Sequence, residues 1–357
     1  MPFVFSIKDS YRHSVEAASH GKQTVLYDNL GNPSIMNIVP KLSYKDVGLG
    51  SSTNALPGFI VGGQEKDELF IGTYPAYVYE GRAYSVPNVT PKVYVTLDQA
   101  DAYCRAKGKG WHCMSRAEYA AIALWCKANG YYPRGNNNWG SDISAPHEKC
   151  RPGTKGSDGR TNLGLTGSGP DSWTHDGTAH GIYGLNGDCH EWNIGARTVD
   201  GEIQVIENND AALETADITA GSAQYKAILQ SGALVAPGTA NTLKIQPSGA
   251  TSGTPTIVTT VTNVTTDSTD MNSDFKSIAV GSGITIPDIL KALALFPSDT
   301  SDHGGDHFWA RNNGERCFFS GGSWYSQAFA GVFCLYGYNQ RTFSNVGLGF
   351  RPAYVSL

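Results

Sequence analysis

A long stretch without periodicity, residues 131–193, constrains the fold of this chain more than any other feature. It is rich in Gly, Asn, Asp and Trp, and it lacks both the alternation of a strand and the spacing of an amphipathic helix. Such a long irregular segment in a compact domain is usually functional or packed by its own side chains. With 17% charged residues and 42 glycines in 357 residues, we expect a loop-rich globular protein and not a disordered one.

Two helices are predicted just before this stretch. Thr96 with Gln99, and Ser115 with Glu118, have the spacing of a capping box, and apolar residues follow each pair at helical intervals. A glycine ends each pattern. The predicted helices cover residues 96–108 and 115–130.

The composition changes again between residues 198 and 300. Eleven of the twenty residues from 251 to 270 are Ser or Thr, which favours extended strand, and one helix is predicted over 287–296, with Pro287 in its first turn. Because the flanking segments resemble each other, we interpret this region as a β-rich insertion into one domain, with a mucin-like linker as the alternative. The expected division is 1–70 (strand-rich attachment segment), 71–197 (main domain, first part), 198–300 (insertion) and 301–357 (main domain, second part).

Charge and hydropathy exclude several functional classes. The net charge of −5 and the absence of a basic run argue against nucleic-acid binding. The longest apolar run, "DILKALALFP", is too short to insert into a membrane, and the N-terminus lacks the pattern of a signal peptide. We therefore expect synthesis in the bacterial cytoplasm without a signal peptide, and release in a virus particle would fit. The seven cysteines are irregularly spaced without a CxxC, which favours free thiols.

The end of the chain has an unusual composition. Eight of the thirty residues from Gly321 to Phe350 are aromatic, Arg341 is the only charged residue among them, and Gly, Asn, Ser and Gln separate the rings. Core strands rarely carry so many small polar residues. Exposed aromatic side chains in a near-neutral patch usually mark a binding surface.

Three motifs in this order resemble the formylglycine-generating-enzyme branch of the C-type-lectin fold. They are "VTLDQADAYCRAKGKGWHCMSRAEYAAIALW", "GIYGLNGDCHEW" and the terminal "GGSW…GLGFRP", and the resemblance covers roughly residues 65–195 and 303–357. It implies an α+β domain, loop-rich with two main helices and small antiparallel sheets. Residues 198–300 would be a β-rich segment inserted into this domain.

The enzymes of this family bind copper through two cysteines that follow the Gly-Gly-Ser-aromatic motif. The matching positions in this chain are Ser326 and Gly331, whereas Cys317 and Cys334 lie elsewhere. The iron-dependent relatives use histidine ligands, and no histidine cluster stands at matching places. We therefore expect the fold without the enzymatic activity and without a cofactor. A metal-dependent oxygenase of the formylglycine-generating type remains the first alternative.

Several other polar residues have both a functional and a structural interpretation. Asn186 and Glu191 have oxygen ligands that suit calcium, which some relatives bind there, but a backbone hydrogen bond for Glu191 is favoured. The loop with Asp302, His303 and Asp306 suggests a metal loop, but a solvated turn is favoured. We interpret the histidines that lie near one another in the sequence as structural: His175, His180 and His190.

The terminal stretch itself resembles the variable region of diversity-generating-retroelement proteins, which use this fold to display a receptor-binding surface. In those systems template adenines are mutated, so Asn codons become codons for many residue types. The positions that look diversified, and that we predict to bind the ligand, are Tyr325, Ser326, Phe329, Cys334, Tyr336, Tyr338, Asn339, Phe343, Asn345 and Val346. The positions expected to pack as a constant scaffold are Gly321, Gly322, Trp324, Phe333, Leu335, Arg341, Gly349 and Phe350.

The sequence thus favours a ligand-binding protein, phage-encoded, on a virion tail or fibre. Its expected partner is a host-surface protein or glycan, because aromatic anchors with adaptable polar neighbours are the chemistry of paratopes. Several copies on one particle would strengthen weak binding, so a homo-oligomer is compatible with this function. A carbohydrate-binding lectin of fixed specificity is the second alternative.

Overall fold

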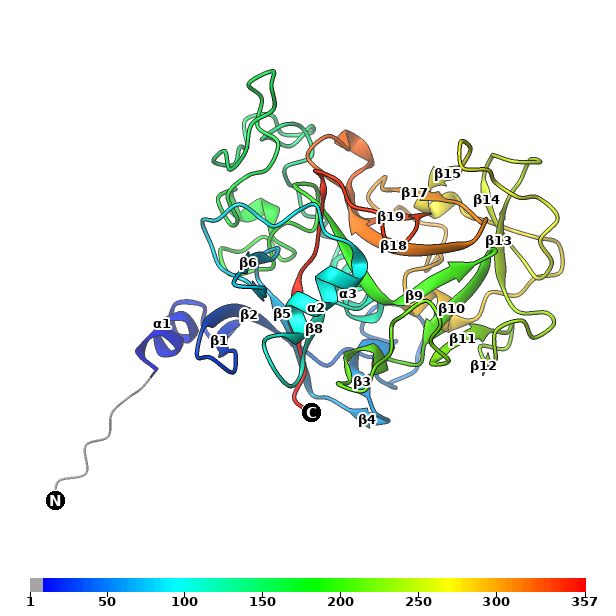
Figure 1. Ribbon diagram of the computed structural model, residues 1–357, viewed down its shortest axis with the longest axis horizontal. Helices are drawn as coiled ribbons and strands as arrows, with labels where there is room; N and C mark the ends of the chain where they lie inside the picture. Colours follow the sequence, from blue (N-terminus) through cyan, green and yellow to red (C-terminus); the bar gives the residue numbers. More distant parts are fainter. Residues whose placement is uncertain (1–8) are drawn as a thin grey trace.

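Two β-sheets and a long irregular segment make up most of the protein (Figure 1). The computed structural model describes residues 9–357 as a mixed α+β fold, mostly sheet with few helices, as the sequence predicts. Residues 131–189 hold only the 3₁₀ turn η2 (Asp171–Trp173) and isolated bridges, which confirms most of the predicted irregular stretch 131–193. Its last four residues instead begin strand β9.

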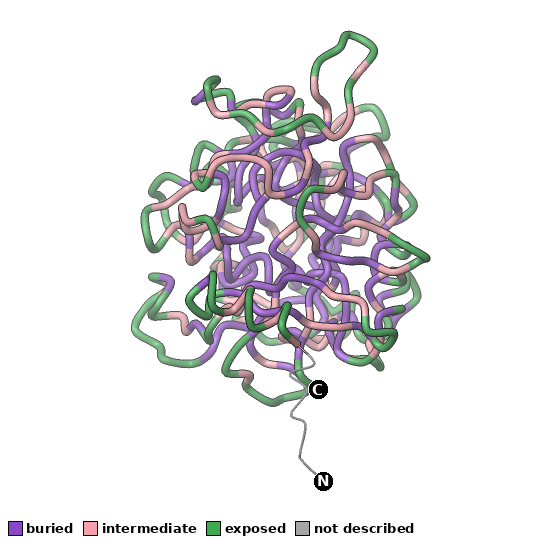
Figure 2. The backbone as a smooth tube through the Cα atoms, turned by 90° about the vertical axis from the view of Figure 1, so that its left-hand side faces the viewer, coloured by how far each residue is buried: buried purple, intermediate pink, exposed green. Residues whose placement is uncertain are grey.

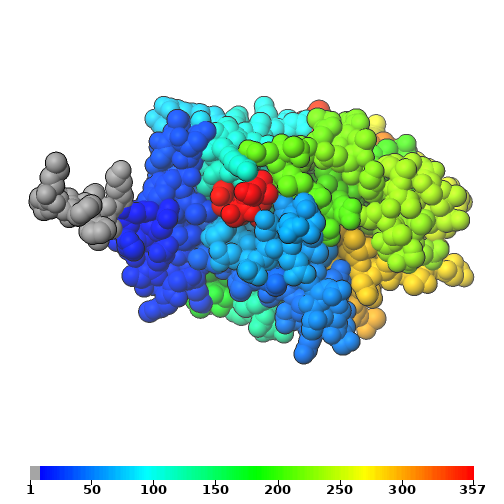
Figure 3. Space-filling model, turned by 90° about the horizontal axis from the view of Figure 1, so that it is seen from below, coloured from blue at the N-terminus to red at the C-terminus, as the bar shows by residue number. Residues whose placement is uncertain are grey.

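The first sheet joins the two ends of the chain. Its order is β1-β2-β5-β21-β8, so that the C-terminal strand lies between strands of the first half of the chain. Figure 3 shows the C-terminal residues in red among the blue and cyan residues of the first half. Its strands are β1 (Gln23–Tyr27), β2 (Pro33–Pro40), β5 (Glu68–Gly72), β21 (Pro352–Tyr354) and β8 (Trp111–Cys113).

The second sheet is larger and carries the terminal aromatic stretch. Its main path is β15-β17-β19-β18-β9-β10-β13-β14-β16; β11 and β12 continue from β10, and β20 pairs with β9. Its strands are β9 (His190–Val199), β10 (Glu202–Ile206), β11 (Tyr225–Ile228), β12 (Leu234–Val235), β13 (Lys244–Pro247), β14 (Pro255–Val258), β15 (Met271–Asp274), β16 (Ala279–Val280), β17 (His307–Ala310), β18 (Glu315–Gly321), β19 (Gly331–Asn339) and β20 (Leu348–Gly349).

Two small hairpins and a few short helices complete the fold. The hairpins are β3 (Ile60–Val61) with β4 (Gln64–Glu65) and β6 (Tyr77–Tyr79) with β7 (Arg82–Tyr84). The helices are α1 (Ser10–Ala18), α2 (Leu97–Arg105), α3 (Arg116–Ala128) and α4 (Asp288–Ala292). The remaining 3₁₀ turns are η1 (Pro57–Phe59), η3 (Asp210–Ala212), η4 (Phe275–Ser277) and η5 (Gln327–Phe329).

Both predicted capping boxes are confirmed. The Thr96 side chain accepts from the backbone N–H of Gln99 at the start of α2, and Ser115 accepts from Glu118 at the start of α3. In each case the Glu or Gln side chain bonds back to the cap, which satisfies two helix N–H groups. Gly130 follows α3 with φ +64°, a left-handed conformation that glycine adopts without strain.

Other expected boundaries differ from the structure. Helix α4 ends at Ala292, short of the predicted Phe296, because Ala294 turns to φ +44° while Leu293 and Leu295 enter the core; Pro287 is its N-cap. The expected division at 70/71 falls inside β5, and the one at 197/198 falls inside β9. The strands of residues 202–280 extend the same sheet as β9, since β10 pairs directly with it.

The interior holds two apolar clusters, and Figure 2 shows buried chain at the centre with exposed turns around it. The larger cluster includes α3 and one side of the second sheet, with Phe308, Phe318 and Phe333. The smaller cluster includes α2 and the other side of that sheet, with Trp192 and Phe319. Apolar side chains therefore cover both sides of the sheet, but the second side is incompletely covered near β19.

Candidate functional site

A continuous set of aromatic rings lies across three neighbouring strands of the second sheet, and we call it the aromatic face. Trp309 on β17 and Phe319 on β18 are the register partners of Tyr336 on β19. The Tyr336 ring stacks on Trp309 with centroids 4.4 Å apart and on Phe319 with centroids 5.1 Å apart. Tyr338 continues the face, 5.5 Å from Tyr336. The five members of the face are Trp309, Phe319, Phe329, Tyr336 and Tyr338.

One edge of the aromatic face is open to solvent. Phe329, on the η5 turn, is 49% exposed, and its ring lies 4.8 Å from His307 and 5.6 Å from Trp309. Tyr325 is 39% exposed and packs its ring against Trp324. Figure 1 shows the strands that carry the face, β17 to β19, beside β15 from residues 202–280. The face therefore combines the terminal stretch with strands that precede it.

Buried polar atoms without partners lie beside these rings. Among residues 9–357, His190 Nδ1, Trp324 Nε1 and Asn339 Nδ2 have no hydrogen-bond partner. The His190 ring lies 4.5 Å from Tyr336, and burial lowers the pKa of this imidazole to about 3, so that it is neutral at ordinary pH. Unpaired buried polar atoms are rare in folded proteins and often belong to functional sites.

The structure divides the ten predicted ligand residues into two groups. Seven are accessible: Tyr325 and Phe329 are exposed, and Tyr336, Tyr338, Phe343, Asn345 and Val346 are half-buried. Tyr336 and Tyr338 are thus less exposed than expected, because they stack on Trp309 and Phe319.

The other three predicted ligand residues are buried, which corrects the expectation that their side chains are exposed. Cys334 is fully buried in β19, and burial raises the pKa of its thiol well above the ordinary value. The Ser326 hydroxyl accepts from the Ser323 N–H at 2.9 Å and holds the turn before η5. Asn339 ends β19 and is only 9% exposed. Of the predicted scaffold residues, Trp324 is half-buried and the other seven are buried.

The two positions where copper-binding cysteines were considered do not form a metal site. A Cβ added to Gly331, which has φ +155°, would lie 2.0 Å from Oδ1 of Asp306. Asp306 is fixed there because its Oδ2 accepts from the Phe333 N–H at 2.7 Å. A cysteine at 331 would therefore displace this carboxylate. Residues 9–357 contain no group of three or more His, Cys, Asp or Glu side chains that could hold a metal ion.

The two residues considered for calcium already have protein partners. Both carboxylate oxygens of Glu191 accept from the Arg351 guanidinium, at 2.9 and 2.5 Å, inside the core. Arg351 also donates to the carbonyl oxygens of Gly72 and Tyr183. The side-chain oxygen of Asn186 accepts from the Asn137 amide. Glu191 and Arg351 therefore form a buried ion pair that connects the two sheets.

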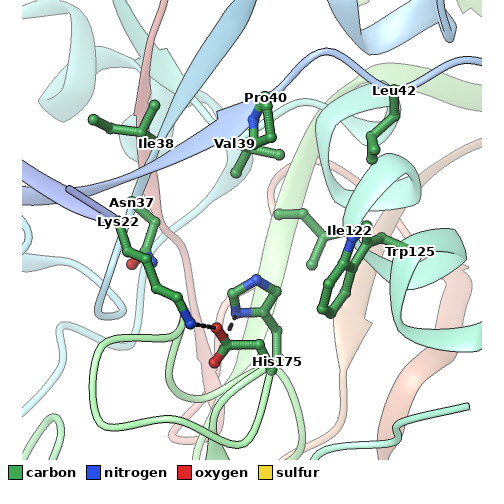
Figure 4. A pocket seen from close by; sticks show the side chains of 10 residues that line it. Lys22, Asn37, Ile38, Val39, Pro40, Leu42, Ile122, Trp125 and His175 are labelled. Atoms are coloured by element: carbon green, nitrogen blue, oxygen red, sulfur yellow. Dashed lines mark hydrogen bonds and ion pairs between the residues drawn. The ribbon is translucent and has the colours of Figure 1, made fainter. Parts of the chain in front are cut away.

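A cavity of about 250 Å³ lies elsewhere in the molecule, between β2, α3 and the loop that carries His175 (Figure 4). Apolar side chains form most of its wall, and Lys22 Nζ pairs with Asp176 Oδ2 at 2.8 Å at its polar end. Burial lowers the pKa of His175 to about 4, which leaves the imidazole neutral. No residue of 321–352 lines this cavity, so it is separate from the aromatic face.

All seven cysteines are free thiols, as predicted. Within the described part of the chain, no helix has the length and hydropathy needed to cross a membrane. Comparison with known proteins gives no match to a family model and none to a curated protein.

Proposed function

We propose that the protein recognises a ligand with its aromatic face, on a C-type-lectin-like fold of the formylglycine-generating-enzyme branch. One observation carries this proposal: a stack of partly exposed rings packs on the buried His190 ring, whose Nδ1 has no hydrogen-bond partner among residues 9–357. Aromatic rings contribute large contact area at low entropic cost, and this polar atom gains a partner only when a ligand or water arrives.

The terminal stretch resembles the variable region of a diversity-generating-retroelement protein, so the proposed role is receptor recognition by a phage particle. A host-surface protein or glycan would be the partner. The strands support such a role, because β19 is bonded on both sides, to β17 and β18. A ring that projects from a strand paired on both sides can be exchanged without loss of a backbone hydrogen bond.

Deep sequencing of the 3′ end of the gene in one growing population tests this proposal. We expect substitutions at the accessible positions, matched by adenines in a nearby template repeat, and none at Phe333 or Phe350. The codons expected to vary are those of Tyr325, Phe329, Tyr336, Tyr338, Phe343, Asn345 and Val346. An invariant 3′ end with no repeat would contradict diversification.

A lectin of fixed specificity is the second candidate, and one observation favours it. Trp309 precedes the terminal stretch, so its ring would offer a constant platform on which a sugar could stack. An invariant Tyr336 and Tyr338 across a population, together with competition by one sugar, would support this candidate. The proposed recognition needs no cofactor, and copper and iron analysis of the purified protein would detect the oxygenase alternative.

A further inference from the structure

A polar groove adjoins the aromatic face where β17 and β19 end. Its volume is about 510 Å³. Residues from three separate segments form its lining: Asp267, Arg311, Arg316, Asn339, Gln340, Thr342, Phe343 and Ser344. The groove meets the aromatic face at Tyr338, because the Arg311 guanidinium lies 5.2 Å from the centre of the Tyr338 ring.

Arg311 has hydrogen-bond donors that no protein group of residues 9–357 uses. Its Nε donates to the backbone oxygen of Thr269 at 2.9 Å, which fixes the side chain. No carboxylate oxygen of residues 9–357 lies within 4.0 Å of the Arg311 guanidinium nitrogens, so Arg311 forms no ion pair there. The Nη groups of its guanidinium have no protein acceptor in the described part of the chain. A cation held over an aromatic ring, with its outer donors unused, is prepared to receive an anion.

Arg316 provides a second, more buried guanidinium. It donates to the backbone oxygens of Asn313 and Tyr338, at 2.8 and 3.0 Å, and these bonds hold it against β19. Among residues 9–357 its only carboxylate partner is Asp267, at 3.4 Å, and the Asp267 side chain is 88% exposed. Such a long contact to a solvated carboxylate contributes little. The groove therefore holds two positive charges against one negative charge.

Asn339 is the independent sign that the groove is incomplete. The residue is only 9% exposed, yet its Nδ2 has no hydrogen-bond partner among residues 9–357. Buried amide donors without an acceptor are rare in folded proteins and call for an explanation. Asn339 lies in the same lining as both arginines.

We propose that this groove binds a carboxylate group of the ligand that the aromatic face recognises, an inference that rests on the proposed function. The single excess positive charge matches a monoanion, and planar guanidinium groups match the planar carboxylate in bidentate geometry. The rings of Tyr338 and Phe343 border the groove and offer contacts to the apolar part of the same molecule. An acidic sugar and an acidic side chain of a host protein both supply this chemistry.

The position of the two arginines gives this groove a distinct role. Arg311 and Arg316 precede Gly321, outside the stretch predicted to vary, whereas the rings of Tyr336 and Tyr338 lie within it. The two guanidinium groups would thus be a constant anchor, whereas the opposite wall of the groove, residues 339–344, lies in the stretch predicted to vary. Ligands of differently diversified copies would differ in shape and share an acidic group.

Titration of the full-length protein with matched charged and neutral probes, followed by NMR, tests the proposal. The pairs are D-glucuronate with D-glucose, and N-acetyl-aspartyl-tyrosine amide with its asparaginyl analogue. At low salt we expect the charged member of at least one pair to bind about tenfold more tightly, and Arg311→Gln to abolish that preference. Asp267→Asn should strengthen the charged probe by about threefold, because it removes the competing carboxylate.

Arg160→Gln is the matched control, because Arg160 also lies over an aromatic ring, 3.9 Å from the centre of Trp139, and the charge change is the same. It should leave the preference intact. Three results would overturn the anchor. The charged and neutral members of both pairs bind equally, Arg311→Gln and Arg160→Gln lose the charge preference to the same extent, or neither charged probe binds. If the wild type binds charged and neutral probes equally and Tyr336→Ala binds none of them, the aromatic face is supported and the groove is rejected as a carboxylate site. A charge preference with an invariant 3′ end would keep the groove and reject diversification.

Discussion

The two sides of strand β19 carry aromatic residues of the same size in very different surroundings. On one side Phe333 packs its ring 5.4 Å from Phe275 and is fully enclosed. On the other side Tyr336 and Tyr338 stack on their neighbours but remain half-exposed. Both sides share one backbone ladder. The difference shows how a sheet can keep its packing on one side while the other side stays accessible.

The scaffold should be most sensitive at the buried ion pair. Replacing Arg351 with Met leaves the Glu191 carboxylate buried without a partner, and breaking such a pair costs about 3–5 kcal/mol. Chemical denaturation of the two proteins measures the loss. Lys41→Met, which removes an exposed partner of Glu65 and Asp67, is the control and should cost at most about 1 kcal/mol. Similar losses in the two variants would contradict the role given to Arg351.

The two sides of the sheet can be compared directly by truncation of one phenylalanine on each. Phe333→Ala opens a cavity in the core and should cost about 3–5 kcal/mol of unfolding free energy. Phe329→Ala removes an exposed ring and should change stability by no more than about 0.5 kcal/mol. Thermal and urea unfolding report both values. A large loss at Phe329 would mean that the aromatic face belongs to the core.

The pH dependence of stability should reveal the neutral histidine under the face. The pKa of His190 is about 3 in the folded protein and 6.5 ordinarily, so below pH 6.5 the unfolded chain binds a proton that the native state does not. The contribution of neutral His190 to the free energy of unfolding is complete above pH 6.5. It is lost as the pH falls toward 3, by about 1.4 kcal/mol per pH unit.

Asp188, whose pKa burial raises to about 6, has the opposite effect: its contribution grows as the pH falls from 6 to 4. The informative quantity is therefore the difference between the wild type and His190→Phe, since both retain Asp188. We expect the variant to gain stability relative to the wild type as the pH falls from 6.5 to 4. A difference that does not change with pH would show that His190 titrates normally.

A helix cap outside the aromatic face should make a modest contribution to stability. Thr96→Ala removes the acceptor for the Gln99 N–H and should cost about 1 kcal/mol, whereas Thr96→Ser should retain most of it. Urea unfolding of the two variants gives the comparison. A loss in Thr96→Ser as large as in Thr96→Ala would assign the effect to the methyl group and not to the cap.

The features predicted well from the sequence depend on local signals. Both capping boxes, the irregular stretch and the buried Phe333 and Phe350 follow from residues close together in the chain. Helix α4 was predicted too long, because packing of Leu293 and Leu295 ends it and propensity does not.

The features that sequence reasoning missed depend on strand order. The aromatic face needs Trp309 and Phe319 beside Tyr336, which follows only from the order β17-β19-β18. The aromatic residues of "HFWA" and "CFF" were a usable signal, but nothing in them shows which strands are neighbours. The pairing of Glu191 with Arg351 across 160 positions had no local signal either.

A stability scan of every substitution from residue 321 to 352, by display and limited proteolysis, would separate an exchangeable aromatic face from a buried core. We predict that most substitutions at Tyr325, Phe329 and Tyr338 leave the fold intact, whereas most at Phe333, Cys334 and Phe350 destroy it. That result would establish an exchangeable face on a constant scaffold. If substitutions at Phe329 and Tyr325 unfold the protein as often as those at Phe333, the rings are core residues and the account is wrong.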